Sequence, residues 1–130
     1  MPDALILSRM RSTSSLFTAC TLARLTLRQL MAVVAESHVV VSLATGPMHL
    51  AAALGIPTVS LFDPRRNNSP TRWQPLGTGV VLRPDVPTCE KCIYEACPYW
   101  DCLDRITVEA VGERITRVLA HAQPIHVADV

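Results

Sequence analysis

Two short apolar, β-branched runs joined by a small helical segment constrain the fold of this chain most. The runs His38–Ser42 and Thr58–Phe62 have the composition of strands that are buried on both faces of a sheet. Residues 43–57 connect them, and this length suits one crossover between parallel strands. The pattern predicts an α/β fold in which helices flank a parallel sheet.

A glycine-containing turn begins the helical part of this connection. Thr45 or Gly46 can cap the helix, and Pro47 suits its first position. Backbone N–H groups in a first helical turn lack partners within the helix, and the helix dipole places partial positive charge there. We expect the N–H groups of Gly46, Met48 and His49, with the Thr45 hydroxyl, to form a site for an anion such as phosphate. The alternative is ordinary capping without a ligand.

The other segments of the chain give a simpler outline. Apolar periodicity and capping residues indicate, in chain order, a helix capped by Thr26, a loop over 63–77, a strand over 79–82, a cysteine-rich loop over 88–103 and a helix from Thr107 to about Ala122. We expect one domain over residues 22–122, preceded by a poorly defined segment over 1–21 and followed by a frayed tail over 123–130.

The charge balance excludes several classes of function. Among the 130 residues, 12 Lys+Arg face 11 Asp+Glu, so the net charge is only +1. A chain without a broad positive field is not expected to bind nucleic acid. No run approaches the roughly 18 consecutive apolar residues of a membrane-spanning helix, and no export signal is recognisable. We therefore expect a cytoplasmic protein with reduced thiols.

Four cysteines stand close together in the sequence, at Cys89, Cys92, Cys97 and Cys102. Four thiolates are the ligand number of a closed tetrahedral zinc site, although the second pair lacks the spacing of a zinc ribbon. The alternative is a loop without metal, whose thiols are either reduced or joined by an opportunistic disulfide. One hypothesis for the chain is therefore a small, zinc-stapled interaction module, and another is a non-functional remnant.

The segment from Ser42 to Phe62, with the sequence TGPMHLAAALG at its centre, resembles the nucleotide-sugar-binding signature of the ADP-heptose:lipopolysaccharide heptosyltransferases, which form glycosyltransferase family 9. The similarity continues in order and spacing over roughly residues 22–120. It implies a GT-B fold of two Rossmann-like domains, of which this chain is part of the C-terminal one. It further implies a glycosyltransferase that moves heptose from ADP-heptose to the lipopolysaccharide core.

The resemblance assigns the substrate site to residues of the turn, namely Thr45, Gly46, Pro47, Met48 and His49. It implies no catalytic residue in this chain, because the acceptor-binding domain with its general base has no counterpart here, so we expect the chain to be inactive alone. Similar cysteine blocks occur in family members regarded as metal-independent. We accordingly expect neither a metal nor a cofactor.

Two positions depart from the family pattern. Ala44 stands where many members have Asp or another polar residue, which removes a side chain able to organise the turn. Asp63 replaces a common glycine and adds negative charge near the expected diphosphate. The neighbouring Arg65 and Arg66 either compensate that charge or are simply solvated, and solvation is the default expectation.

An incomplete parallel sheet exposes an apolar edge, from which we predict self-association of the chain into a homo-oligomer. The expected partners are thus a nucleotide-sugar donor, a second copy of the chain and, only together with the missing domain, a lipopolysaccharide-core acceptor. We expect the protein to be cytoplasmic, and attachment to the periphery of the inner membrane is the alternative.

Overall fold

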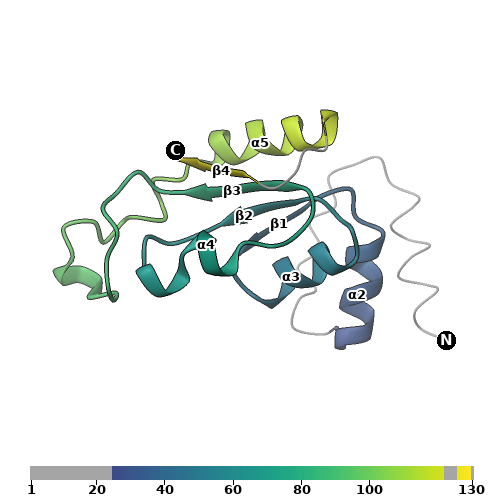
Figure 1. The fold of residues 1–130 in the computed structure, drawn as a ribbon, viewed down its shortest axis with the longest axis horizontal. Helices are drawn as coiled ribbons and strands as arrows, with labels where there is room; N and C mark the ends of the chain where they lie inside the picture. Colours follow the sequence, from purple (N-terminus) through teal and green to yellow (C-terminus); the bar gives the residue numbers. More distant parts are fainter. Residues whose placement is uncertain (1–24, 122–125, 130) are drawn as a thin grey trace.

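The fold is a parallel sheet covered by helices, seen in a computed structural model that describes residues 25–121 and 126–129 (Figure 1). The strand order is β1-β2-β3-β4, and every neighbouring pair is parallel. The strands are β1 (Val40–Leu43), β2 (Thr58–Leu61), β3 (Gly79–Arg83) and β4 (His126–Asp129). The helices are α2 (Leu27–Ala35), α3 (Gly46–Ala53), α4 (Pro70–Trp73) and α5 (Val108–Ala120), with short 3₁₀ helices η2 (Arg66–Asn68) and η3 (Tyr94–Ala96). The α/β fold predicted from the sequence is confirmed.

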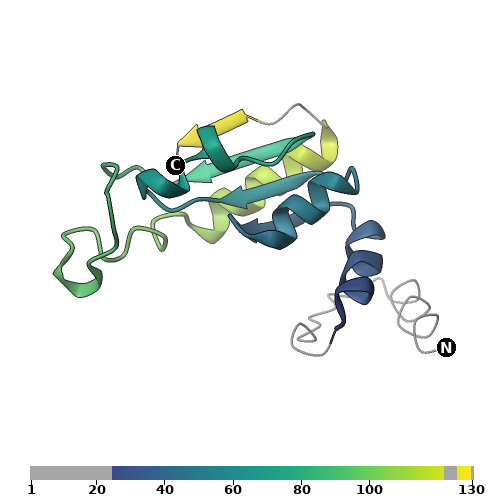
Figure 2. The same ribbon diagram turned by 60° about the horizontal axis from the view of Figure 1, so that its bottom comes forward.

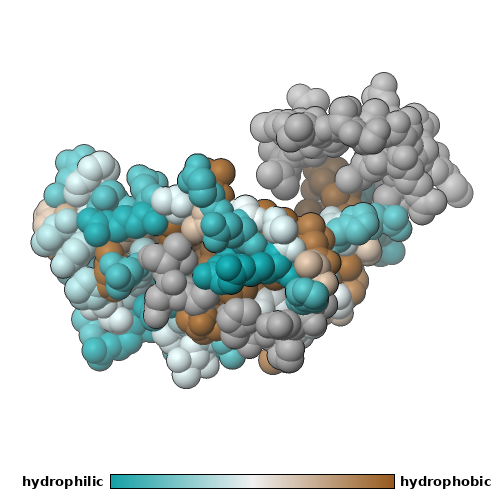
Figure 3. Space-filling view, turned by 90° about the horizontal axis from the view of Figure 1, so that it is seen from above, coloured by the Kyte–Doolittle hydropathy of each residue, from teal (hydrophilic) through white to brown (hydrophobic). Residues whose placement is uncertain are grey.

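The sheet is buried on both faces. Neighbouring side chains of each strand point in opposite directions, so one strand contributes residues to both sides of the core. On one face, Val80 and Leu82 pack with Val118 of α5. On the other face, Val81 packs with Met48 and Phe62. Helices α5 and α3 accordingly lie on opposite sides of the sheet (Figures 1 and 2). Seen from the side of α5, the surface is largely hydrophilic, with hydrophobic patches between the polar side chains (Figure 3).

Threonine caps begin two of the helices, as their sequence positions predict. The Thr26 side chain accepts a hydrogen bond from the Gln29 N–H, and the Gln29 side chain accepts one from the Thr26 N–H, which completes a capping box. At the start of α5, the Thr107 hydroxyl accepts from the Ala110 N–H at 3.2 Å. Each cap satisfies an N–H that the helix itself leaves without a partner.

The prediction of a frayed C-terminal tail is wrong for residues 126–129. They form β4, which pairs in parallel with β3 and places Val127 beside Val81. The open edge of β3 offers backbone hydrogen-bonding groups to this segment, and a strand formed in this way depends little on the composition of the tail. The predicted N-terminal segment over 1–21 lies outside the described residues.

The loops that follow β1, β2 and β3 gather at one end of the sheet. The cysteine-containing loop between β3 and α5 extends beyond the carboxyl ends of the strands, near α4 and η2 (Figures 1 and 2). Open α/β sheets place their ligands at this end. The fold therefore directs attention to the start of α3 and to the two loops beside it.

Candidate functional site: the turn before α3 and its cleft

The turn between β1 and α3 leaves two amides, those of Gly46 and His49, without a recorded acceptor among the described residues. Thr45 is the N-cap, in an extended conformation, and Gly46 is the first residue of α3. Among the described residues, no acceptor is recorded for the Gly46 N–H. A Cβ added at Gly46 would meet nothing within 4 Å, so space is open around this backbone. The N–H of Gly46 can therefore bind a ligand from solvent.

The structure corrects the expectation for Met48. Its side chain is fully buried and packs with Phe62 and Val81. Its N–H donates to the Thr45 carbonyl at 3.1 Å, so this amide is already occupied. Met48 therefore serves packing and internal hydrogen bonding, and its own N–H is not available to an anion.

The other predicted residues of the turn occupy different positions. His49 is exposed and lines a cleft together with Thr45 and Gly46. The Thr45 hydroxyl donates to the Leu43 carbonyl at 3.3 Å, so a ligand must displace this weak bond to use it. Pro47 is exposed but does not line the cleft, and its role is to begin the helix.

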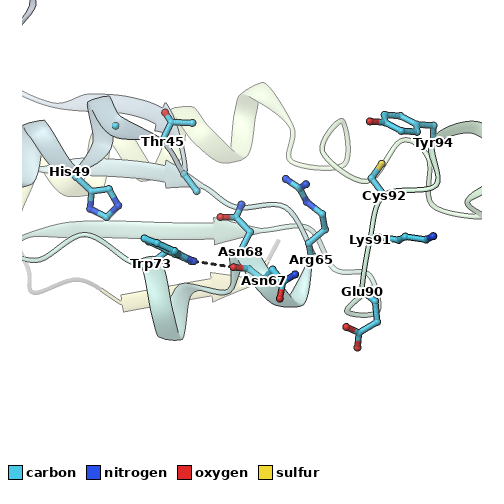
Figure 4. A pocket seen from close by; sticks show the side chains of 12 residues that line it. Thr45, His49, Arg65, Asn67, Asn68, Trp73, Glu90, Lys91, Cys92 and Tyr94 are labelled. Carbon is cyan, nitrogen blue, oxygen red and sulfur yellow. Dashed lines mark hydrogen bonds between the residues drawn. The ribbon is translucent and has the colours of Figure 1, made fainter. Parts of the chain in front are cut away.

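The cleft has a volume of about 730 Å³ and three walls (Figure 4). The turn before α3 contributes the first wall, with Thr45 and His49. The loop after β2 contributes the second, with Arg65, Asn67 and Asn68. The loop after β3 contributes the third, with Glu90, Lys91, Cys92 and Tyr94. These segments come from three different connections of the sheet, so tertiary structure assembles the site.

An ion pair fixes the loop after β2. The Arg65 guanidinium donates to the Asp63 carboxylate at 2.6 Å, and the Asn68 amide donates to the same carboxylate at 3.0 Å. Burial acts to raise the pKa of Asp63, but the hydrogen bonds from Arg65 and Asn68 and the Arg65 charge outweigh it and hold this pKa below its usual value. The default expectation of a simply solvated arginine is wrong for Arg65, which compensates the Asp63 charge.

The second and third walls are tied together by backbone and side chains. The Arg66 N–H donates to the Cys89 carbonyl at 2.8 Å, and the Cys89 N–H donates to the Pro64 carbonyl at 3.1 Å. The Arg66 guanidinium also lies 3.1 Å from the Glu90 carboxylate. Both groups of this ion pair are well exposed, so the backbone pair contributes more to the rigidity.

Sequence reasoning missed much of the cleft, including Lys91 and Trp73. Lys91 lines the third wall and makes no ion pair with any described residue, so its positive charge is uncompensated. The Trp73 indole N–H donates to the Asn67 carbonyl at 2.9 Å and fixes a large apolar side wall (Figure 4). The signals in the sequence for this part of the cleft were weak: a pair of arginines and a tryptophan within a long loop.

The cysteines give no support to a metal centre. Within residues 25–121 and 126–129, no group of three or more His, Cys, Asp or Glu side chains is placed to hold a metal ion. Cys89, Cys92, Cys97 and Cys102 are all free thiols. Burial raises the pKa of Cys102, which opposes formation of a thiolate. Cys20 lies outside the described residues.

Comparison with known proteins shows the family of the chain. A sequence model of Glycosyltransferase family 9 (heptosyltransferase) matches residues 3–100, which is well over half of the chain. The chain belongs to glycosyltransferase family 9. The glycosyltransferase and heptosyltransferase character inferred from the resemblance is thereby confirmed at the level of the family.

Two curated relatives of this family 9 chain carry similar names. The chain is 38% identical over 90 residues to "Lipopolysaccharide heptosyltransferase 1" of Pseudomonas aeruginosa, a match that covers 68% of this chain and 24% of the relative. It is 42% identical over 33 residues to a "Putative glycosyltransferase" of Haemophilus influenzae, covering 25% of this chain and 10% of the relative. The family 9 chain thus spans about a quarter or less of either relative's length.

Two further findings concern solved structures and membrane-spanning helices. No solved structure matches it significantly. In the part of the chain that the structure describes, no helix has both the length and the apolar character needed to cross a membrane.

Proposed function

We propose that the cleft beside α3 binds the diphosphate of a nucleotide-sugar donor of the ADP-heptose type. The observation that carries the proposal is the open Gly46 N–H, which lies at a helix N-terminus in a cleft that also contains Arg65 and Lys91. A phosphate oxygen accepts from a backbone N–H at such a position, and the helix dipole favours its charge. His49 is placed to add one hydrogen bond.

The same groups serve the chemistry of transfer. An acceptor hydroxyl oxygen forms a bond to the anomeric carbon while the bond from that carbon to the diphosphate breaks, and the bonding electron pair leaves with the diphosphate. Donors held in place before the reaction stabilise this growing charge more than water does. The Gly46 N–H and the Lys91 ammonium take that role, and the hydroxyl proton passes to a general base outside this chain.

The acceptor in this proposal is a lipopolysaccharide core, in keeping with the name of the Pseudomonas relative. The chain matches 24% of that relative, so we propose that the chain binds the donor but does not transfer the sugar alone. A soluble domain in the cytoplasm, at the periphery of the inner membrane, would meet both substrates.

Titration with ADP, followed by ligand-observed NMR, tests the donor site. Gly46→Glu places a carboxylate where the diphosphate binds, and we expect at least a tenfold loss of affinity. Gly46→Ala is the matched control, because its Cβ meets nothing within 4 Å. We expect the alanine variant to keep ADP affinity within about twofold, since the N–H remains.

Stability separates a binding effect from a folding effect. A glutamate in the first turn of a helix interacts favourably with the helix dipole, so Gly46→Glu is expected to melt at or above the wild-type temperature. ADP binding that is equal in the wild type and in Gly46→Glu would contradict the proposal. So would the absence of any ADP binding to the folded chain.

A further inference from the structure

The cysteines of the loop between β3 and α5 gather around a second cavity, of about 480 Å³, beside the cleft. Its walls include four thiols and three aromatic rings, those of Cys89, Cys92, Cys97, Cys102, Tyr94, Tyr99 and Trp100. The two cavities share one wall, formed by Arg65, Lys91, Cys92 and Tyr94. The fold therefore brings several thiols to one place, next to the cleft in front of α3.

Cys89 and Cys92 are held near the same cation. The chain bends at the two residues between them, Glu90 and Lys91. The hydrogen bond and the charge of Asp63 raise the pKa of Arg65, and the negative charges of Cys92 and Cys89 raise it further. Exposed charges are screened by solvent beyond a short distance. Both sulfur atoms therefore lie near the Arg65 guanidinium.

The two thiols differ in their freedom to move and in their access to solvent. Cys89 is partly buried, and its backbone is fixed: its N–H donates to the Pro64 carbonyl at 3.1 Å, and its carbonyl accepts from the Arg66 N–H at 2.8 Å. Cys92 is exposed and lines both cavities. An accessible thiol beside a second thiol is the arrangement of redox-sensitive cysteines, in which the first reacts and the second resolves.

The other two cysteines are less suited to react. Burial raises the pKa of Cys102, which opposes formation of the reactive thiolate. The Cys97 sulfur accepts a hydrogen bond from the Tyr99 N–H at 3.4 Å, which ties it to its own turn. The cavity therefore favours reaction between Cys92 and Cys89.

We propose that Cys92 and Cys89 form a reversible disulfide by exchange with a low-molecular-weight disulfide, and that this modification weakens binding in the cleft. The Cys92 thiolate attacks one sulfur of the small disulfide, forms a mixed disulfide and releases one small thiolate. The Cys89 thiolate then attacks the Cys92 sulfur, and the electron pair of the broken S–S bond leaves with the second small thiolate. The two released thiolates take up the protons that the protein thiols lost. Two protein thiols are thus oxidised, and one small disulfide is reduced to two thiols.

The disulfide affects the cleft because the same segment forms its third wall. Lys91 lies between the paired residues, and Lys91, Cys92 and Tyr94 all line the cleft (Figure 4). Cys89 is anchored to the loop after β2, so ring closure moves the Lys91–Cys92 end of the segment. The effect on a nucleoside diphosphate rests on the proposed function of the cleft, whereas formation of the disulfide does not.

Treatment of the 130-residue chain with oxidised glutathione, in a Cys20→Ser background, tests the bond itself. Trypsin cleaves after Lys91, so a disulfide from Cys89 to Cys92 joins two tryptic peptides that a reductant separates. We expect tandem mass spectrometry to locate this bond in the parent chain and in the matched control Cys97→Ser. In Cys89→Ser, the mixed disulfide with glutathione should remain on Cys92.

Titration with ADP before and after oxidation, followed by ligand-observed NMR, tests the effect on the cleft. We expect oxidation to lower ADP affinity about two- to fivefold, the range that one exposed charge contributes. Reductant should restore the affinity. The affinity of Cys92→Ser should not respond to the oxidant.

The outcomes separate this inference from the proposed function. A cooperatively melting chain that forms no disulfide overturns the inference, and so does a bond from Cys89 to Cys97 or Cys102 in place of Cys92. A bond between Cys89 and Cys92 that leaves ADP affinity unchanged overturns the effect on the cleft. If the reduced chain binds no ADP, the proposed function fails, and the peptide analysis alone decides whether the thiol site exists.

Discussion

Arg65 and Asp63 form a 2.6 Å ion pair on a loop that lines both cavities. Asp63 takes up part of the arginine's charge, whereas Lys91, on the opposite loop of the cleft, makes no ion pair with any described residue. We therefore propose different roles for the two basic residues: Arg65 shapes the loop, and Lys91 supplies charge.

The Asp63 ion pair should stabilise the fold in a pH-dependent way. Asp63→Asn is expected to lower the free energy of unfolding by about 1 kcal/mol at neutral pH, a modest effect because Arg65 is 48% exposed and the pair is screened by solvent. Folding lowers the pKa of Asp63 below its ordinary 3.8. The stabilisation is therefore complete above the unfolded-state pKa and is lost as pH falls through the lower folded-state pKa.

Urea denaturation at two pH values measures this difference. The variant should be less stable than the wild type at neutral pH, and the two should converge as pH falls below the folded-state pKa of Asp63, where the carboxyl is protonated in both states. A difference that persists unchanged in acid would show that shape, and not charge, is responsible.

Removal of the Lys91 charge should weaken ADP binding without affecting the fold. Lys91→Met keeps most of the length of the side chain, and we expect roughly a fivefold loss of ADP affinity, corresponding to about 1 kcal/mol. The loss should shrink as salt is added, because the site is open to solvent. Calorimetric titration at two salt concentrations checks both statements. Glu90→Gln on the same wall is the control, and it should not weaken binding.

Gly79 is required by its close approach to the neighbouring strand. Its φ is +137°, and an added Cβ would lie 2.0 Å from the Thr58 carbonyl oxygen. Gly79→Ala should therefore destabilise the chain by about 2 kcal/mol or more. Gly112→Ala in α5 is the matched control: it meets nothing within 4 Å and should stabilise the helix by about 0.5–1 kcal/mol. Thermal denaturation of both variants gives the comparison.

Strand β1 is the expected surface for self-association. Val41 and Leu43 are 42% and 52% exposed, and among the described residues β1 has a partner strand on one side only. Leu43→Lys should shift the chain toward monomer, because a charge on an edge strand opposes pairing with another strand. Leu76→Lys, at an 85% exposed loop position, should have no effect. Light scattering after size-exclusion chromatography measures the change, and a wild type that is already monomeric would contradict the prediction.

The thiols should differ in reactivity and should not depend on metal. Cys92 is exposed, whereas Cys102 is partly buried with a raised pKa. Alkylation followed by peptide mass spectrometry should therefore label Cys92 first, because the thiolate is the reacting form. A strong chelator should leave the melting temperature unchanged. A large fall in melting temperature would revive the zinc-stapled alternative.

Local sequence was sufficient for some of these features. The strand composition of Thr58–Phe62, the caps at Thr26 and Thr107 and the turn at Gly46 all depend on residues within a few positions of one another. Backbone geometry near proline, glycine and threonine is set by short-range sterics and hydrogen bonds. Such features can be predicted from one chain without an alignment.

Other features depend on residues that are distant in the sequence. Met48 could be assigned to the anion site only by assuming that its amide was free. In the structure its side chain lies in the core, where it packs against Phe62 and Val81. Strand β4 forms because β3 offers an open edge. The composition of residues 126–129 did not lead us to predict a strand. Packing and strand pairing therefore depend on other segments of the same chain that are distant in the sequence.

The sequence alone determined that this chain folds as parallel strands with a capped helix over a glycine turn, because those preferences are local. Only the tertiary structure decided that Arg65 neutralises Asp63, that Lys91 lines the same cleft as the start of α3 and that three aromatic rings share one cavity. These relationships join separate loops at one end of the sheet, and loop placement follows from the sheet they connect. The local sequence pattern therefore does not predict how these loops are placed relative to one another.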